Sequence, residues 1–198
     1  MLRQTPSQTI GPFFGFGLVP AQYGFAGAAI GSGTMVTDQV AGQRIRITGQ
    51  VFDGAGMVVP DALIEVWQAD AAGRYGGPAQ EPQAGSPDAA FTGFGRVGTG
   101  AKPDARFVFE TIKPGSVDAL QAPHLHVTLF MRGLLRHVCT RIYFSDEREA
   151  NLRDPVLRAV PHDRRDTLIA WRDETSAFQT YSFDIHMQGE RETVFFDV

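Results

Sequence analysis

The sequence predicts a mostly β protein, with a β-sandwich core, an extended N-terminal arm, long loops and one or two short helices. From residue 44 onward, short runs of alternating apolar and polar residues recur, as expected of half-buried strands. Glycine, proline and aspartate separate these runs, which is typical of sandwiches and barrels. Before residue 43 there is neither a helical nor an alternating period. We therefore expect an arm over 1–42 and one sandwich domain over 43–198.

Composition excludes several classes of function. The chain has 198 residues and a net charge of -4, with both signs interspersed. One domain of this size buries a sizeable core, and a nucleic-acid-binding surface would instead show a basic stripe. The single cysteine, Cys139, cannot form an internal disulfide and lies in an apolar run, where it predicts a small buried hydrophobe. A reducing compartment, the cytoplasm, fits this usage.

The arm has no charged residue between Arg3 and Asp38. Proline and glycine interrupt every apolar run in it, so we expect neither a transmembrane helix nor a signal peptide. We also expect little regular structure. An uncharged segment dotted with aromatic residues is suited to cover another apolar surface, and a neighbouring subunit is the obvious candidate.

The core begins with two strands, at 44–51 and 62–68, joined by a turn rich in glycine. Trp67 in the second strand is most simply a core residue. Residues 70–105 show no period, and a loop of this length in a compact domain is usually functional or mobile. Tyr75 lies at its start.

The remainder alternates short strands with turns. A helix is expected to begin at Ser145, followed by acidic residues in its first turn, and to end at Pro155. The expected strands are 106–112, the histidine-bearing strand within 121–132, 136–144, 168–171, 181–187 and 193–198.

The strand within 121–132 carries the densest chemistry. Side chains alternate across a strand, so two different faces are expected. The core face holds Leu125, Val127, Leu129 and Met131, and the other holds His124, His126, Thr128, Phe130 and Arg132.

Two imidazoles at i and i+2 on one strand face can bind a single metal ion, although strand histidines are more often structural. Tyr75 could add a phenolate, a hard donor suited to ferric iron, or it could be an ordinary surface aromatic. Arg132 lies six residues beyond His126, roughly 20 Å along an unbroken strand, which is too far to serve the same metal. Any role of Arg132 must lie elsewhere.

Several separate motifs, in the same order, resemble the aromatic intradiol ring-cleaving dioxygenases. Together with the Thr-Pro-Ser-Gln-Thr arm at 5–9 and the Phe-Phe-Asp-Val end at 195–198, they extend the resemblance over nearly the whole chain. These motifs are Glu65–Tyr75, Thr111–Gly115, Ala122–His126, Arg141–Phe144 and Gly189–Asp197.

The resemblance implies a β-sandwich core and an alpha–beta heterodimer assembled into larger oligomers. In the iron-bearing chain of the family, two tyrosines and two histidines hold a non-haem Fe(III). Carried over, these positions are Tyr75, His124 and His126, while the second tyrosine falls on Val117, which has no donor atom. The set is incomplete, so we interpret it as a remnant and expect Fe(III) in a partner beta chain.

Two neighbouring positions also depart from the family pattern. The arginine expected three residues before the first histidine is Gln121, and the glutamine expected before the Tyr-Phe pair is Arg141. Because that arginine is expected to stabilise charge developing on the substrate, its replacement weakens the case for catalysis by this chain alone.

The resemblance also implies a role for Arg132, at the other end of the histidine-bearing segment. In the family, the alpha arm and an arginine after the histidine strand help to build the pocket of the beta chain. The corresponding residues here are Thr9, Gly11, Pro12, Phe13 and Arg132. Gly11 and Pro12 would allow close approach of the backbone, and Phe13 stands where a tyrosine is usual. Arg132 could bind a carboxylated aromatic substrate, or form a salt bridge at the rim between subunits.

The expected function is therefore that of a pocket-completing subunit, not catalytic alone, in a heteromeric enzyme that uses O2 on a carboxylated catechol. Two alternatives remain open at this stage. One is a self-sufficient Fe(III) dioxygenase, and the other is a non-enzymatic β-sandwich that binds a ligand or partner.

Overall fold

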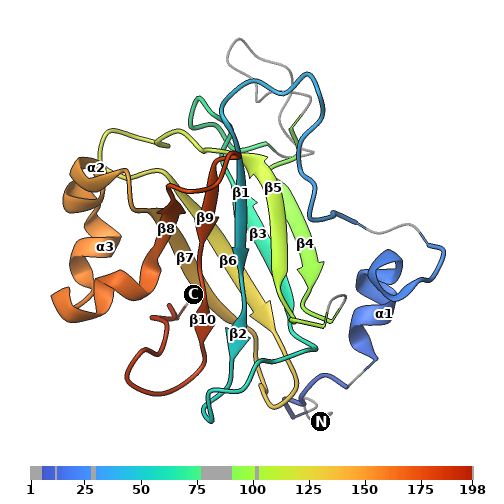
Figure 1. Ribbon diagram of the computed structural model, residues 1–198. Helices are drawn as coiled ribbons and strands as arrows, with labels where there is room; N and C mark the ends of the chain where they lie inside the picture. Colours follow the sequence, from blue (N-terminus) through green and yellow to red (C-terminus); the bar gives the residue numbers. More distant parts are fainter. Residues whose placement is uncertain (1–5, 12, 28–29, 77–90, 101–102, 198) are drawn as a thin grey trace, which may run out of the picture.

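The computed structural model describes residues 6–11, 13–27, 30–76, 91–100 and 103–197. Its main body is one eight-stranded sheet that curls until it is nearly closed into a barrel, which confirms the mostly β fold class (Figure 1). The strands, in their order across this sheet, are β4 (Phe94–Gly98), β3 (Leu63–Gln68), β6 (His124–Phe130), β7 (Val138–Phe144), β8 (Ile169–Asp173), β9 (Thr180–Ser182), β1 (Arg44–Gly49) and β5 (Phe107–Ile112).

The sheet consists of two halves that face each other across the core. Antiparallel pairing joins β4, β3, β6 and β7, and the parallel pair of β7 with β8 connects them to the other half. A second, two-stranded sheet pairs β2 (Val51–Phe52) with β10 (Ile185–His186) in parallel. Apolar side chains from both halves fill the space between them, among them Ile45, Ile47, Ile64, Val66, Phe107, Phe109, Leu125, Val127, Leu129 and Ile142.

Strand β6 shows the two faces that alternation predicted. Leu125, Val127 and Leu129 are 1% exposed or less and belong to the core. The histidines lie on the opposite, outer face, because successive side chains of a strand point to opposite sides. The burial of the core face therefore fixes which way both imidazoles point.

Some local expectations were wrong. Strand β4 lies inside the predicted loop 70–105; its short, glycine-containing sequence gives little signal, and pairing with β3 stabilises it. Trp67 is half-buried on the outer face rather than in the core, because its neighbours Val66 and Gln68 point inward instead. Cys139 is likewise half-buried, since it also lies on the outer face.

The C-terminal segment is less regular than predicted. Residues 181–187 are split between β9 and β10, two strands that belong to different sheets. Within 193–197 there is only an isolated bridge, between Phe196 and Cys139, rather than a strand.

Two helical segments lie in the predicted arm, α1 (Phe14–Leu18) and the 3-10 helix η1 (Pro20–Tyr23), where little regular structure was expected. Contacts of Phe16 with Tyr23 and Phe25 hold this segment together. Helices α2, α3 and η2 pack on the opposite flank of the barrel (Figure 1).

Helix α2 (Arg148–Arg153) ends before Pro155 as predicted, but Ser145 does not cap it. Ser145 instead accepts a hydrogen bond from the backbone of Arg172 in β8. Pro155 begins a second helix, α3 (Pro155–Ala159), and the 3-10 helix η2 (His162–Leu168) follows. In the part of the chain that the structure describes, no helix is both long and apolar enough to cross a membrane.

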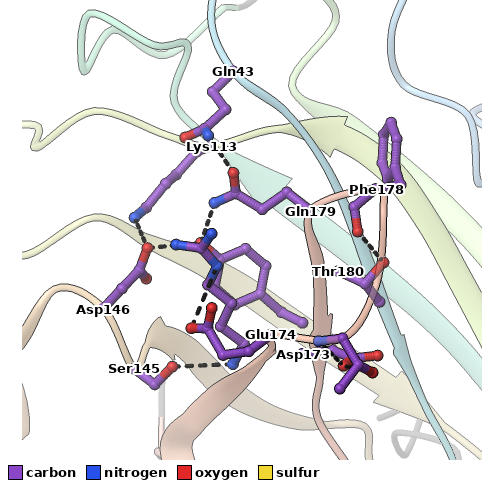
Figure 2. Close-up of polar contacts among 12 residues, drawn as sticks. Gln43, Lys113, Ser145, Asp146, Asp173, Glu174, Phe178, Gln179 and Thr180 are labelled. Atoms are coloured by element: carbon purple, nitrogen blue, oxygen red, sulfur yellow. Dashed lines mark hydrogen bonds and ion pairs between the residues drawn. The ribbon is translucent and has the colours of Figure 1, made fainter.

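A polar cluster fixes one end of the barrel (Figure 2). Lys113, which follows β5, places its ammonium 2.8 Å from Asp146, just after β7. The carboxylate of Glu147 lies 2.7 Å from the same ammonium. Tyr181 of β9 donates a hydrogen bond to Asp146 at 2.9 Å. Burial alone would lower the pKa of Lys113, but the hydrogen bonds to Asp146 and Glu147 outweigh it and leave this pKa raised. The cluster thus ties three strand ends together.

We predict that Lys113→Met lowers the free energy of unfolding by about 2 kcal/mol, because two partly buried carboxylates lose their cation. Urea denaturation of the chain measures this. Arg172→Met removes an exposed cation 3.6 Å from Glu174 and should change stability by no more than about 0.5 kcal/mol. Equal effects of the two substitutions would contradict a structural role for the cluster.

Candidate functional site

Two histidines on the outer face of β6 form the centre of the candidate site. His124 is 3% exposed and its Nδ1 lies 2.7 Å from the carbonyl oxygen of Ala122. That nitrogen must carry the proton, so Nε2 of the neutral ring is an acceptor. It faces Nε2 of His126 at 3.3 Å. The strand thus aims both Nε2 atoms at one region.

Tyr75 lies beside this pair. Its ring centroid is 6.3 Å from that of His126, and it stacks on Trp67 at the same centroid distance, with the planes 6° apart. Val117 also belongs to this neighbourhood: a Cβ built on Gly73, two residues before Tyr75, would lie 3.3 Å from the Cα of Val117. The structure therefore brings Tyr75, His124 and His126 together and places Val117 against Gly73.

Both imidazoles of the site are neutral at neutral pH, and a guanidinium lies beside them. Burial lowers the pKa of His124, and burial together with the charge of Arg141 lowers that of His126 to about 4. Burial raises the pKa of the Tyr75 phenol, so it stays protonated at neutral pH. Arg141 stands directly opposite His126 in the β6–β7 register.

This donor set does not fit a ferric ion. Fe(III) is stabilised by anionic ligands, whereas this site offers two imidazoles and a single phenol, with the guanidinium of Arg141 opposite His126. Val117 adds no donor. Among the described residues there is also no group of three or more His, Cys, Asp or Glu side chains that could hold a metal. The interpretation of Tyr75, His124 and His126 as an incomplete set stays a prediction.

A partly buried hydrogen-bond network beside the histidines was not predicted from the sequence. Nη1 of Arg141 donates to Oε1 of Gln121 at 3.4 Å and to the hydroxyl of Tyr143 at 3.3 Å. Tyr143 donates in turn to the fully buried Asp154 at 3.1 Å, and burial raises the pKa of Tyr143. Asp154 also accepts the backbone N–H of Ala122 at 2.9 Å. These hydrogen bonds thus link Gln121 and Arg141, the two positions expected to depart from the family pattern, to the backbone that holds His124.

The signal for Asp154 was present in the sequence, since an aspartate just before a proline is typical of a helix N-cap. Its side chain accepts the backbone N–H of Leu157 at 2.8 Å as the cap of α3. Its second role, toward Tyr143, depends on how α3 packs on the sheet and has no local signal.

The arginine end of β6 differs from the prediction in one respect. The strand ends at Phe130, so Arg132 lies in the following turn rather than on the strand. Its Nε donates to the carboxylate of Asp61, and its side chain is 54% exposed. The next residue, Gly133, donates its backbone N–H to Oγ1 of Thr9 at 2.8 Å. One arm residue of the predicted group therefore touches the turn that carries Arg132.

The other arm residues do not converge on the histidines of their own chain. Gly11 is exposed, and a Cβ added there would meet nothing within 4 Å. Phe13 is 70% exposed and contacts Phe16. Pro12 lies outside the described residues. Gly11, Phe13 and Arg132 are each exposed among the residues that the structure describes.

A cleft of about 870 Å³ between α2, η2 and β8 contains none of the predicted site residues. Trp171 and Leu152 in its lining are 58% and 71% exposed. Arginines and carboxylates line it together, so its charge does not select an anion. It provides no group that could continue the histidine site.

Comparison with known proteins places these features in a family. The family model described as Dioxygenase matches residues 20–189. The chain therefore belongs to the dioxygenase family, in its intradiol ring-cleaving class. An intradiol ring-cleavage dioxygenase from Tetranychus urticae has the same fold, with a TM-score of 0.62 and 18% identity over 86% of this chain and 94% of that one.

Two relatives from Burkholderia cepacia narrow the comparison. The chain is 50% identical to a protocatechuate 3,4-dioxygenase alpha chain, over 100% of this chain and 98% of the relative. It is 35% identical to a protocatechuate 3,4-dioxygenase beta chain, over 77% of this chain and 67% of the relative. It is thus similar to both chain types and more similar to the alpha type. The expected resemblance to subunits of an intradiol enzyme is confirmed.

The depressed pKa of His126 predicts a pH-dependent signal. In the isolated, metal-free chain, NMR should show His126 titrating near pH 4 instead of at its ordinary value of 6.5, because its buried ring stays neutral. Between pH 6.5 and about 4 the unfolded chain binds a proton that the folded chain does not, so stability falls as the pH decreases through this window. His126→Gln should remove that part of the pH dependence. A His126 midpoint near 6.5 would contradict the described environment.

Proposed function

We propose that this chain is the alpha subunit of a protocatechuate 3,4-dioxygenase, and that it completes the active-site pocket of an iron-bearing beta subunit. The observation that carries the proposal is the contrast between the two ends of β6. At one end the set Tyr75, His124 and His126 lacks a donor at Val117 and faces a cation. At the other end, Arg132 is exposed and touches Thr9 through the next residue.

The proposed reaction is the O2-dependent cleavage of protocatechuate between its two hydroxylated carbons, giving 3-carboxy-cis,cis-muconate. The partner's Fe(III) would supply the Lewis-acid and redox chemistry when bound. Residues of this chain would recognise the substrate carboxylate, for which an exposed guanidinium is well suited. Gly11, Pro12 and Phe13 would line the pocket and exclude water.

The proposal includes the partners and the organisation of the chain. The alpha and beta chains would form a heterodimer that assembles into a larger oligomer, with Fe(III) in the beta chain. Residues 1–42 would act as an arm that reaches the partner, and 43–198 as the sandwich domain. Cytoplasmic location is proposed because the chain has a single cysteine, which is half-buried and free.

Two other functions would leave different evidence. A self-sufficient Fe(III) dioxygenase would need Tyr75, so Tyr75→Phe would abolish the activity of the chain alone. A non-enzymatic binding module would not co-purify with an iron-bearing homologue. The position of Arg141 opposite His126 argues against the first alternative, because a cation beside the histidines opposes metal binding.

Expression with and without the beta chain tests the proposal directly. We predict that the chain alone contains no stoichiometric iron and shows no tyrosinate-to-iron charge-transfer absorption. Co-expression should yield a coloured complex that opens protocatechuate. Stoichiometric coloured iron with turnover in the isolated chain would refute the assignment.

For the assembled enzyme, we predict that Arg132→Ala raises the KM for protocatechuate about tenfold without loss of iron, since one charge-assisted contact of about 1.4 kcal/mol is removed. Steady-state kinetics and metal analysis measure both effects. Arg153→Ala changes an exposed arginine of α2, on the opposite flank of the barrel, and serves as the matched control. Unchanged kinetics for Arg132→Ala would rule out a role in the pocket.

A further inference from the structure

The ion pair between Asp61 and Arg132 follows from the register of two strands. In the antiparallel pair of β3 with β6, Leu63 stands opposite Phe130. Extending this register by two residues at each end places Asp61 opposite Arg132, on the same outer face, because side chains alternate. The structure shows this contact, with Arg132 Nε donating to Oδ2 of Asp61. The pair is therefore built into the sheet, although both residues lie just outside the strands.

The contact with Asp61 does not involve the terminal Nη groups of the Arg132 guanidinium. Only Nε of Arg132 is engaged, and its terminal Nη groups form no hydrogen bond with the described residues. The two Nη groups form the fork that binds a carboxylate through two parallel hydrogen bonds. Asp61 thus engages the guanidinium at Nε, and the two Nη groups have no hydrogen-bond partner among the described residues.

The same turn is tied to the arm. Gly133 donates its backbone N–H to Thr9 at 2.8 Å. Tyr23, which follows in the arm, lies close to Asp61 as well: burial raises the pKa of this phenol, and the negative charge of Asp61 raises it further. The arm and the Arg132 turn therefore meet around Asp61, and their positions depend on each other.

We propose that Asp61 is a positioning residue, which orients Arg132 so that its terminal Nη groups meet the carboxylate of the aromatic substrate in the partner's pocket. The inference rests on the proposed function. It deepens that function by naming Asp61 as the residue through which Arg132 selects substrates that carry a carboxylate. Asp61 itself does not touch the substrate, and it is 20% exposed in its side chain, less than half the value of Arg132.

An electrostatic role and a positioning role of Asp61 predict opposite changes in the KM when Asp61 is replaced by asparagine. Asp61→Asn removes a negative charge beside the substrate carboxylate, so electrostatics alone would lower the KM of the assembled enzyme. If Asp61 orients Arg132, the loss of the ion pair releases the guanidinium and the KM rises. The direction of the change therefore separates a positioning residue from a mere neighbouring charge.

The experiment uses the co-expressed alpha–beta enzyme. We expect Asp61→Asn to raise the KM for protocatechuate by about three- to tenfold, with kcat and iron content unchanged, since uniform binding is weakened. For a catechol without the carboxylate, the KM should stay the same. Asp61→Glu retains the carboxylate and should lie within about twofold of the parent enzyme, which also controls for folding.

A second comparison isolates the pair itself. The KM of the double variant Asp61→Asn/Arg132→Ala should not exceed that of Arg132→Ala alone, because without Arg132 the carboxylate of Asp61 has no guanidinium to orient. Asp104→Asn removes the carboxylate of another aspartate–arginine pair, 3.7 Å from Arg106, and should leave the KM unchanged.

A lowered or unchanged KM in Asp61→Asn, or equal increases for both substrates, would overturn the inference. If Arg132→Ala raises the KM and Asp61→Asn does not, only the inference fails. If Arg132→Ala is itself without effect, the pocket role in the proposed function fails as well.

Discussion

The antiparallel register of β3, β6 and β7 is the constraint on which the rest of the structure depends. Leu125, Val127 and Leu129 must face the core, so the intervening residues of β6 face outward. The same register then sets their partners: Arg141 stands opposite His126, and Asp61 opposite Arg132 just beyond the last strand pair. A slip of this register by one residue would bury the histidines and expose the core side chains. The partners of His126 and of Arg132 are therefore set together by one register.

This register separates two chemical environments on one face. At the start of β6, burial keeps both imidazoles neutral and Tyr75 protonated, and Arg141 adds a positive charge beside them. The chain of Tyr143 and Asp154 holds that arrangement in place. At the other end the guanidinium of Arg132 is anchored through one nitrogen and otherwise exposed. The histidine end is internally satisfied, while the terminal Nη groups at the arginine end form no hydrogen bond with the described residues.

Much of this could be predicted from residues close together in the sequence. The faces of β6, the end of α2 before Pro155 and the missing donor at Val117 depend on alternation, on proline and on one side chain. Other features gave no local signal. Strand β4 is stabilised by pairing with β3, Trp67 lies outside the core because its neighbours point inward, and Ser145 bonds to a strand rather than capping a helix. Each depends on a partner distant in the sequence.

The sequence by itself determined the fold class and the family, because strand alternation and residue type require no knowledge of distant neighbours. Only the tertiary structure decided how those residues are used. It set Asp61 against Arg132 across 71 positions and Thr9 against Gly133 across 124. It also connected Tyr143 to the cap of α3. The physical reason is that hydrogen bonds and ion pairs need atoms within about 3 Å, and the packing of the sheet, rather than spacing along the chain, brings such atoms together.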